Sequence, residues 1–295
     1  MKFERPCFLT PDAKWHAEGD EGVEDFAAEG GFDDLVGARA VLQPLAEGAP
    51  PEVARTGWIR TPVDRFVMAR LGRIPRTADQ FEVFPGYLSK EGYILEAGSG
   101  LGATLLKLRD MGYKVIGCDY AERALHQFRA HDASIPLHTA DVHALPYATN
   151  SLHGYLSFGV FEHFAQGMGG ALREAHRVLV PGGILVLTIP YPNVVNRLVR
   201  WRRKMAGQSV LNNDDFFEST YTRRALEREL TDAGFEVLVA KPTSHSFTFW
   251  GLGGAFRAPG YYRTSALAEF CGALARETLP WAFNYSTMMI GRKKD

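Results

Sequence analysis

From about residue 79 to the C-terminus, short apolar runs alternate with segments in which apolar residues recur every three or four positions. The apolar runs predict strands at 93–97, 114–119, 135–140, 153–158, 184–189, 235–240 and 282–291. The periodic segments predict helices at 103–111, 121–130, 170–179 and 222–233. Strands that alternate with helices are typical of a parallel sheet covered by helices, so the pattern predicts an α/β fold.

The N-terminal region does not follow this alternation. Residues 1–78 show poor hydrophobic periodicity, apart from a short amphipathic helix expected at 63–71. We therefore interpret residues 1–78 as an N-terminal extension or cap, and residues 79–295 as the main domain.

Two insertions, at residues 191–218 and 242–280, interrupt the strand–helix rhythm of the main domain. Insertions of this length in a compact domain are usually functional or mobile. Both insertions are rich in aromatic residues. These side chains either enclose an apolar, aromatic or sugar-bearing ligand or pack on one another over the sheet. They are Phe216, Phe217, Phe247, Phe249, Trp250, Tyr261 and Tyr262.

The turn after the first predicted strand is rich in glycine. The apolar run at 93–97 contains an acid, Glu96, and glycines follow at alternate positions, Gly98, Gly100 and Gly102. Glycines at this spacing let the backbone turn sharply into a helix and approach a ligand without a Cβ in the way. The turn predicts a ligand site at the carboxyl end of the first strand and the N-terminus of the first helix.

Asp119 ends the second predicted strand, where an acid can accept hydrogen bonds from the two hydroxyls of a ribose. Enzymes that bind NAD and enzymes that bind S-adenosylmethionine both combine such an acid with a glycine-rich turn. The dinucleotide fingerprint has its third glycine three positions after the second, whereas Gly102 comes two after Gly100. No Tyr-x-x-x-Lys pair follows the fourth strand, which also argues against NAD(P). A structural interpretation stays open, in which the glycines serve the turn alone and Asp119 and Asp141 cap the segments that follow them.

The ordered set of motifs resembles the class I S-adenosylmethionine-dependent methyltransferases, in particular the type 11 group, over roughly residues 80–240. The resemblance implies a Rossmann-like fold with helices on both faces of a seven-stranded, mostly parallel sheet of order 3-2-1-4-5-7-6. It also implies that S-adenosyl-L-methionine is the cofactor. The implied cofactor-binding residues are Glu96, Gly98, Ser99, Gly100, Gly102, Asp119, Tyr120, Asp141, Val142, Ser157 and Phe158.

Methyl transfer from a sulfonium is an in-line displacement that depends mainly on alignment, and a base is needed only for a protonated acceptor. His163, in the Glu-His pair after the fourth strand, is the candidate base, with a local structural role at a helix start as the alternative. Tyr191 and Tyr221 are further candidate catalytic residues that would line the acceptor pocket, and His245 is another candidate. The three cysteines show no metal-type spacing, so no metal is expected.

The segment 194–205 in the first insertion predicts a basic amphipathic helix, with Val194, Leu198, Trp201 and Met205 in one stripe. Such a helix can lie on an anionic membrane or receive an anionic acceptor. We expect instead a packed lid helix whose basic face is solvated.

Composition narrows the class of protein. The net charge of −1 and the ordinary hydrophobic (46%) and charged (23%) fractions are typical of a globular enzyme and disfavour nucleic acid as a partner. No signal peptide and no apolar run of about 18 residues is recognised, and widely spaced cysteines suit a reducing compartment, so a cytoplasmic location is expected.

The sequence therefore predicts a methyltransferase that acts on an oxygen or nitrogen of a small-molecule, lipid- or glycan-linked acceptor. Two alternatives stay open: a carbon methyltransferase of quinone- or lipid-like metabolism, and a non-catalytic S-adenosylmethionine-binding partner subunit. The oligomeric state is not predicted.

Overall fold

The computed structural model describes residues 80–294, except positions 165, 206–218 and 260–262. The expected N-terminal extension, its helix at 63–71 and the aromatic residues Phe216, Phe217, Tyr261 and Tyr262 lie outside the described residues.

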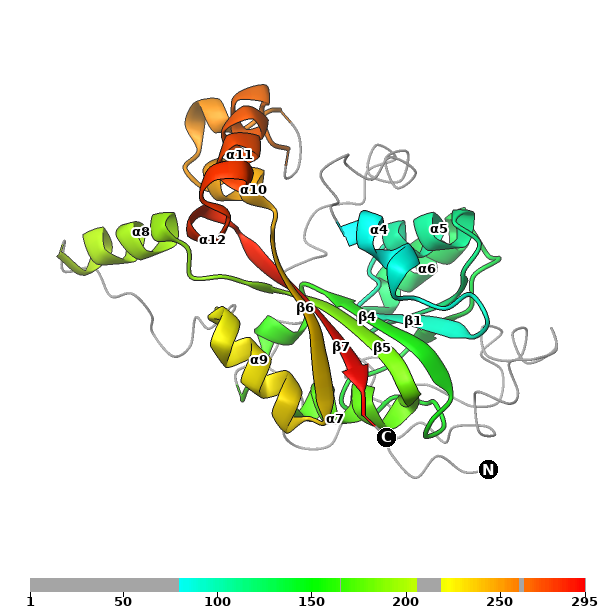
Figure 1. Ribbon diagram of the computed structural model, residues 1–295. Coiled ribbons are helices and arrows are strands. Elements are labelled where there is room, and N and C mark those ends of the chain that lie inside the picture. The colour runs from blue at the N-terminus through cyan, green and yellow to red at the C-terminus, as the bar shows by residue number, and fades with distance from the viewer. Residues whose placement is uncertain (1–79, 165, 206–218, 260–262, 295) are drawn as a thin grey trace.

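A seven-stranded sheet of order β3-β2-β1-β4-β5-β7-β6 forms the centre of the fold (Figure 1). Only β7 runs antiparallel to its neighbours, β5 and β6. This confirms the expected strand order and the mostly parallel sheet. The strands are β1 Tyr93–Ala97, β2 Lys114–Asp119, β3 Leu137–Thr139, β4 Leu152–Phe158, β5 Leu179–Pro190, β6 Phe235–Thr243 and β7 Ser286–Lys293.

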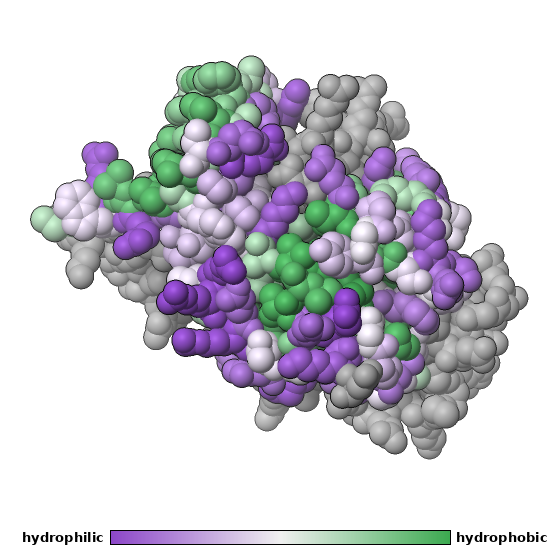
Figure 2. All heavy atoms as spheres, viewed as in Figure 1, coloured by the Kyte–Doolittle hydropathy of each residue, from purple (hydrophilic) through white to green (hydrophobic). Residues whose placement is uncertain are grey.

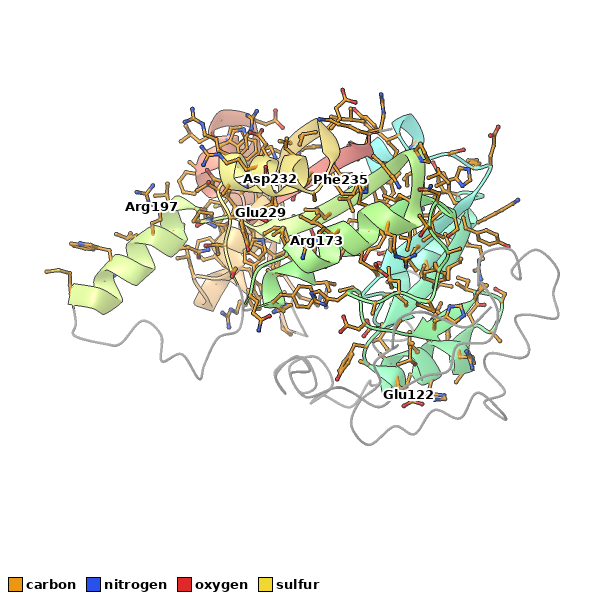
Figure 3. The ribbon with its side chains drawn as sticks, turned by 90° about the horizontal axis from the view of Figure 1, so that it is seen from below. Glu122, Arg173, Arg197, Glu229, Asp232 and Phe235 are labelled. Atoms are coloured by element: carbon orange, nitrogen blue, oxygen red, sulfur yellow. The ribbon has the colours of Figure 1, made fainter. Side chains whose placement is uncertain are left out.

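Helices cover both faces of the sheet, as expected. On one face lie α4 (Gln80–Val83), the 3₁₀ turn η1 (Phe84–Gly86), α5 (Ala103–Asp110) and α6 (Glu122–His131), and on the other lie α7 (Gly169–Val178) and α9 (Arg223–Asp232) (Figure 1). Leu105 and Phe128 pack into the core of the first face, and Leu172 and Leu226 into that of the second. Figure 3 shows α7 and α9 side by side, with Arg173 on the former and Glu229 on the latter.

The predicted starts of the fifth and the last strand are wrong. The Pro181-Gly182-Gly183 segment was expected to separate a helix from a strand beginning at 184, but α7 ends at Val178 and β5 starts at once. The register between β4 and β5 shifts at this point, so these residues form an irregularity within the strand. The last strand begins at Ser286, because the proline at the start of α12 (Pro280–Phe283) favours a helical turn there.

The two insertions follow the carboxyl ends of β5 and β6 (Figure 1). The first contains α8 (Val194–Met205), which extends away from the sheet. The second begins after β6, which runs to Thr243 rather than ending at 240, and forms a small helical unit. That unit consists of α10 (His245–Trp250), the 3₁₀ turn η4 (Gly254–Phe256), α11 (Ala266–Thr278) and α12. Among the described residues, no helix has the length and hydrophobicity to span a bilayer.

Candidate functional site

The loop from β1 to α5 is held in a conformation that only glycine adopts easily. Gly98, Gly100 and Gly102 have φ values of +83°, +52° and +72°, where a side chain is strained. A Cβ on Gly98 would lie 2.2 Å from Val160 Cγ2, and one on Gly102 would lie 2.6 Å from the ring of Phe128. A Cβ on Gly100 would meet nothing within 4 Å. The outer glycines are therefore required by packing, whereas the middle one borders open space.

Asp119 joins this loop to the end of β2. Its Oδ2 accepts a hydrogen bond from the Gly100 amide at 2.7 Å, and its Oδ1 accepts one from the Ala121 amide at 2.7 Å. Burial raises the pKa of this carboxyl group, and the backbone amides oppose that rise. Each carboxylate oxygen can accept more than one hydrogen bond, so both remain able to accept a ligand hydroxyl.

Three buried polar atoms gather near the loop without a hydrogen-bond partner among the described residues. They are Glu96 Oε2, Ser99 Oγ and Ser157 Oγ. Glu96 pairs with Leu156 in the β1–β4 ladder, so Ser157 follows directly at the end of the neighbouring strand. Buried polar groups are nearly always hydrogen-bonded, so these atoms indicate a polar ligand at this edge of the sheet.

Burial also raises the pKa of Glu96, to about 8. The negative charge of Asp119 adds to the rise, while a hydrogen bond with the Thr104 side chain opposes it. A carboxyl group in this position favours a cationic partner, which would restore its ionised form.

Asp141 and Val142 follow β3 and are both buried. Asp141 Oδ1 accepts from the His143 backbone amide at 2.8 Å and lies 2.7 Å from His143 Nδ1. Asp141 thus has the local capping role that the sequence left open as an alternative to adenine binding. Both contacts use Oδ1, which is only one of its two carboxylate oxygens.

The two remaining predicted cofactor residues border the same edge. Tyr120 follows Asp119 and is half-buried. Phe158 ends β4 and stacks on Phe84, with ring centroids 6.2 Å apart. The ends of β3, β2, β1 and β4, which are neighbours in the sheet, therefore bring the predicted set together. In parallel sheets this edge is where ligands bind.

A family described as "Methyltransferase domain" matches residues 95–187, which contain the glycine loop, Asp119, Asp141 and the end of β4. These residues therefore form a methyltransferase domain of the class I S-adenosylmethionine-dependent type. The cofactor of this family is S-adenosyl-L-methionine, and the buried acceptors at the strand ends fit its amino group and ribose hydroxyls. The NAD(P) alternative is thereby set aside.

Two curated proteins are similar to parts of this chain. A 37.1 kDa protein in transposon TN4556 of Streptomyces fradiae is 32% identical over 52% of this chain and 46% of its own length. A probable S-adenosylmethionine-dependent methyltransferase of Mycolicibacterium smegmatis is 31% identical over 33% of this chain and 37% of its own length. The chain thus spans less than half the length of these relatives.

Solved methyltransferase structures share the fold. The 1,6-didemethyltoxoflavin-N1-methyltransferase of Burkholderia thailandensis, solved with bound 1,6-didemethyltoxoflavin and S-adenosylhomocysteine, superposes with a TM-score of 0.52. The superposition covers 86% of this chain and 94% of that one at 17% identity. At this identity the likeness concerns the fold alone.

The three candidate catalytic residues lie near the ends of β4 and β5. His163 is half-buried in the 3₁₀ turn η2 (Phe161–His163), rather than at the start of an α-helix. The Tyr221 amide donates to the Pro190 carbonyl at 3.1 Å, and burial raises the pKa of the Tyr221 phenol. Tyr191 follows β5 and packs edge-on against Trp281, with ring centroids 5.7 Å apart.

His245, the further candidate in the second insertion, is buried at the start of α10. Its Nε2 lies 2.9 Å from the Pro280 carbonyl oxygen. This contact ties α10 to α12, which gives the imidazole a structural role.

A pocket lies beside Tyr191, which the sequence predicted as a residue of the acceptor pocket; the other residues that line it were not predicted. The pocket has a volume of about 520 Å³ and is lined by Tyr191, Thr222, Arg223, Arg224, Glu227 and Trp281. The Arg223 guanidinium lies over the Trp281 ring, 5.4 Å from its centroid, and donates to Glu227 Oε1 at 2.7 Å. Two local features of the sequence fall on this pocket, the helix cap Thr222 and the Pro280-Trp281 turn. Neither feature indicates that the two segments meet.

We expect S-adenosylhomocysteine to bind more tightly as the pH rises from 6.5 to 8, by about tenfold, and then to level off. The reason is that Glu96 is mostly protonated below its pKa of about 8 and must ionise to pair with the ligand's ammonium group. Calorimetric titration in buffers of different ionisation enthalpy should show a proton released on binding. A Glu96→Gln variant should lose the pH dependence, and an unchanged pH profile in that variant would contradict the pairing.

Proposed function

We propose that this chain transfers the methyl group of S-adenosyl-L-methionine to an oxygen or nitrogen of a small-molecule, lipid- or glycan-linked acceptor. The observation that carries the proposal is the pocket beside Tyr191 and Trp281, because Tyr191 follows β5, and the carboxyl end of β5 lies at the same edge of the sheet as those of β4 and β2. Its volume of about 520 Å³ suits a small molecule or one end of a larger one.

The cofactor residues in this proposal are the ones that the sequence predicts. The loop glycines and Asp119 hold the ribose, and Glu96 faces the amino group. Asp141 and Val142 lie beside the adenine, and Ser157 and Phe158 end the strand nearest the sulfonium. These assignments are supported by the shared edge of the sheet.

The bound cofactor supplies an electrophilic methyl group, and the chain's own residues orient the acceptor and remove its proton. His163 is the proposed base, because its turn follows β4 directly and histidine is the side chain that most often serves as a general base in enzymes. Tyr191 forms the aromatic wall of the pocket with Trp281. Tyr221, whose phenol is held protonated by burial, is suited to donating a hydrogen bond rather than to acting as a base.

Titration with S-adenosylhomocysteine beside NADH tests the cofactor, and release of S-adenosylhomocysteine from S-adenosylmethionine tests turnover. Pools of phenols, amines and extracted lipids should each be supplied as acceptors. Turnover with any pool supports a catalyst, and the methylated product identifies the accepting atom. Tight cofactor binding without release in any pool would instead favour the non-catalytic partner subunit.

Once an acceptor is found, two variants should separate chemistry from acceptor binding. His163→Ala should lower kcat by about 100-fold with little change in KM, because a general base contributes at least that much. Trp281→Ala should raise the acceptor KM by about tenfold with kcat largely kept, because it removes one wall of the pocket. Steady-state kinetics at saturating S-adenosylmethionine measures both. An unaffected kcat in His163→Ala would show that His163 is not the base.

A further inference from the structure

Helix α8 exposes the apolar stripe that its sequence predicts. Val194, Leu198, Trp201 and Met205 lie on one side of the helix and are exposed by 48–72%. In the described part of the chain α8 contacts α12 and then extends outward (Figure 1). The expectation of a packed lid helix is therefore wrong for the described residues, since the stripe faces outward.

Helix α11 has its small residues inside and its large apolar residues outside. Ala268, Gly272 and Ala275 are buried toward the core of the insertion, and a Cβ on Gly272 would lie 2.5 Å from Ser246 Oγ of α10. Leu267, Phe270 and Leu274 lie on the opposite side and are exposed by 45–68%. A surface helix normally turns its large apolar residues inward, so this arrangement indicates an interaction surface.

A buried asparagine fixes the two insertions relative to each other. Asn193, just before α8, donates from Nδ2 to Thr248 Oγ1 at 3.2 Å and to the Asn284 carbonyl at 3.1 Å. Its Oδ1 accepts from the Asn196 amide at 2.9 Å and so caps α8. Figure 2 shows hydrophobic residues over α8 and over the α10–α12 unit at the same end of the molecule.

The charge of α8 identifies what this surface fits. The helix holds five basic residues and no acidic residue, in a chain whose net charge is −1. Arg197 and Arg202 are exposed and flank the apolar stripe on its two sides in a helical projection. Arg197 lies near the base of the projecting helix (Figure 3). A second copy of this chain, packed symmetrically, would bring two such basic helices together, which is unfavourable.

We propose that the exposed faces of α8 and α11 together form a docking surface for an anionic lipid membrane. The apolar residues would enter the boundary between headgroups and acyl chains, with Trp201 at the level of the headgroups. Arg197 and Arg202 would pair with lipid phosphates. The surface is not a spanning segment, because α8 has 12 residues.

Docking would also bring the proposed acceptor pocket to the membrane. Tyr191, which lines the pocket, lies two residues before the cap Asn193 of α8. This consequence rests on the proposed function, since it makes the acceptor a molecule carried in or on the bilayer. The docking itself does not depend on the reaction.

Co-sedimentation of the full chain with vesicles tests the proposal. We expect binding to phosphatidylcholine vesicles that contain phosphatidylglycerol, little binding to phosphatidylcholine alone, and release as salt rises to about 0.5 M. Leu198→Ser/Trp201→Ser and Phe270→Ser/Leu274→Ser should each reduce vesicle affinity by at least about tenfold. Arg197→Glu/Arg202→Glu should reduce it similarly, and only on the anionic vesicles.

The matched control is Tyr87→Ser, which changes an exposed aromatic residue at η1, outside both insertions. Its vesicle binding should equal that of the unchanged chain, and every variant should keep its affinity for S-adenosylhomocysteine. The proposal would be overturned if the chain did not bind anionic vesicles, or if it bound neutral vesicles equally well. It would also be overturned if sedimentation velocity showed a dimer that dissociates in the Trp201 variant, while the unchanged chain bound no vesicles. Vesicle binding without methyl transfer would contradict the proposed function alone.

Discussion

Asp119→Ala should weaken binding of S-adenosylhomocysteine by about 1–3 kcal/mol, or about 5- to 150-fold. Two effects combine in this loss. The variant removes the acceptor proposed for the ribose hydroxyls, and it also frees the Gly100 and Ala121 amides, which now donate to the carboxylate at 2.7 Å. Calorimetric titration measures the change directly.

Two further variants distinguish the causes. Asp119→Asn keeps the size of the side chain and one oxygen acceptor, so its affinity should fall less than that of Asp119→Ala. Asp110→Ala removes the same charge from an exposed position on α5 and should leave affinity unchanged. If Asp119→Ala binds as tightly as the unchanged chain, Asp119 does not bind the ribose and its role is to hold the loop.

The cofactor edge could be predicted from the sequence because its signals are local. An apolar run such as 93–97 becomes a strand buried in the sheet, and alternating glycines leave the backbone few alternatives to a sharp turn. Once the strands are placed, parallel topology carries Glu96, Asp119 and Asp141 to one edge. The prediction was wrong where a single residue decides the boundary of an element. Pro280 favours the helical turn α12, which occupies the start of the strand predicted at 282–291.

The acceptor side could not be predicted because it depends on contacts between distant segments. Tyr191 and Trp281 are 90 positions apart, and nothing in either segment indicates that their rings meet. The capping role of Asn193 is visible in the sequence, but its bonds to Thr248 and Asn284 are not. Likewise, periodicity shows that α8 has an apolar stripe, but not whether anything covers it.

The loop glycines should separate into two classes when each is changed to alanine. Gly98→Ala should lower the free energy of unfolding by about 3 kcal/mol, because left-handed strain adds to a clash 2.2 Å from Val160 Cγ2. Gly100→Ala should lower it by only about 1 kcal/mol, since its Cβ meets nothing within 4 Å. Urea unfolding measures both.

The loss of cofactor affinity should be larger in Gly100→Ala than in Gly98→Ala, the reverse of the order expected for stability. The Gly100 amide donates to Asp119, so a methyl group at Gly100 would project into the space proposed for the ribose. In a folded protein this methyl group should weaken S-adenosylhomocysteine binding by at least about tenfold. Any Gly98→Ala protein that remains folded should bind with a smaller loss. The contrast matters because a merely structural loop would lose stability and affinity together, whereas a loop shaped around a ligand loses them at different glycines. Full affinity in Gly100→Ala would place the ligand away from this turn.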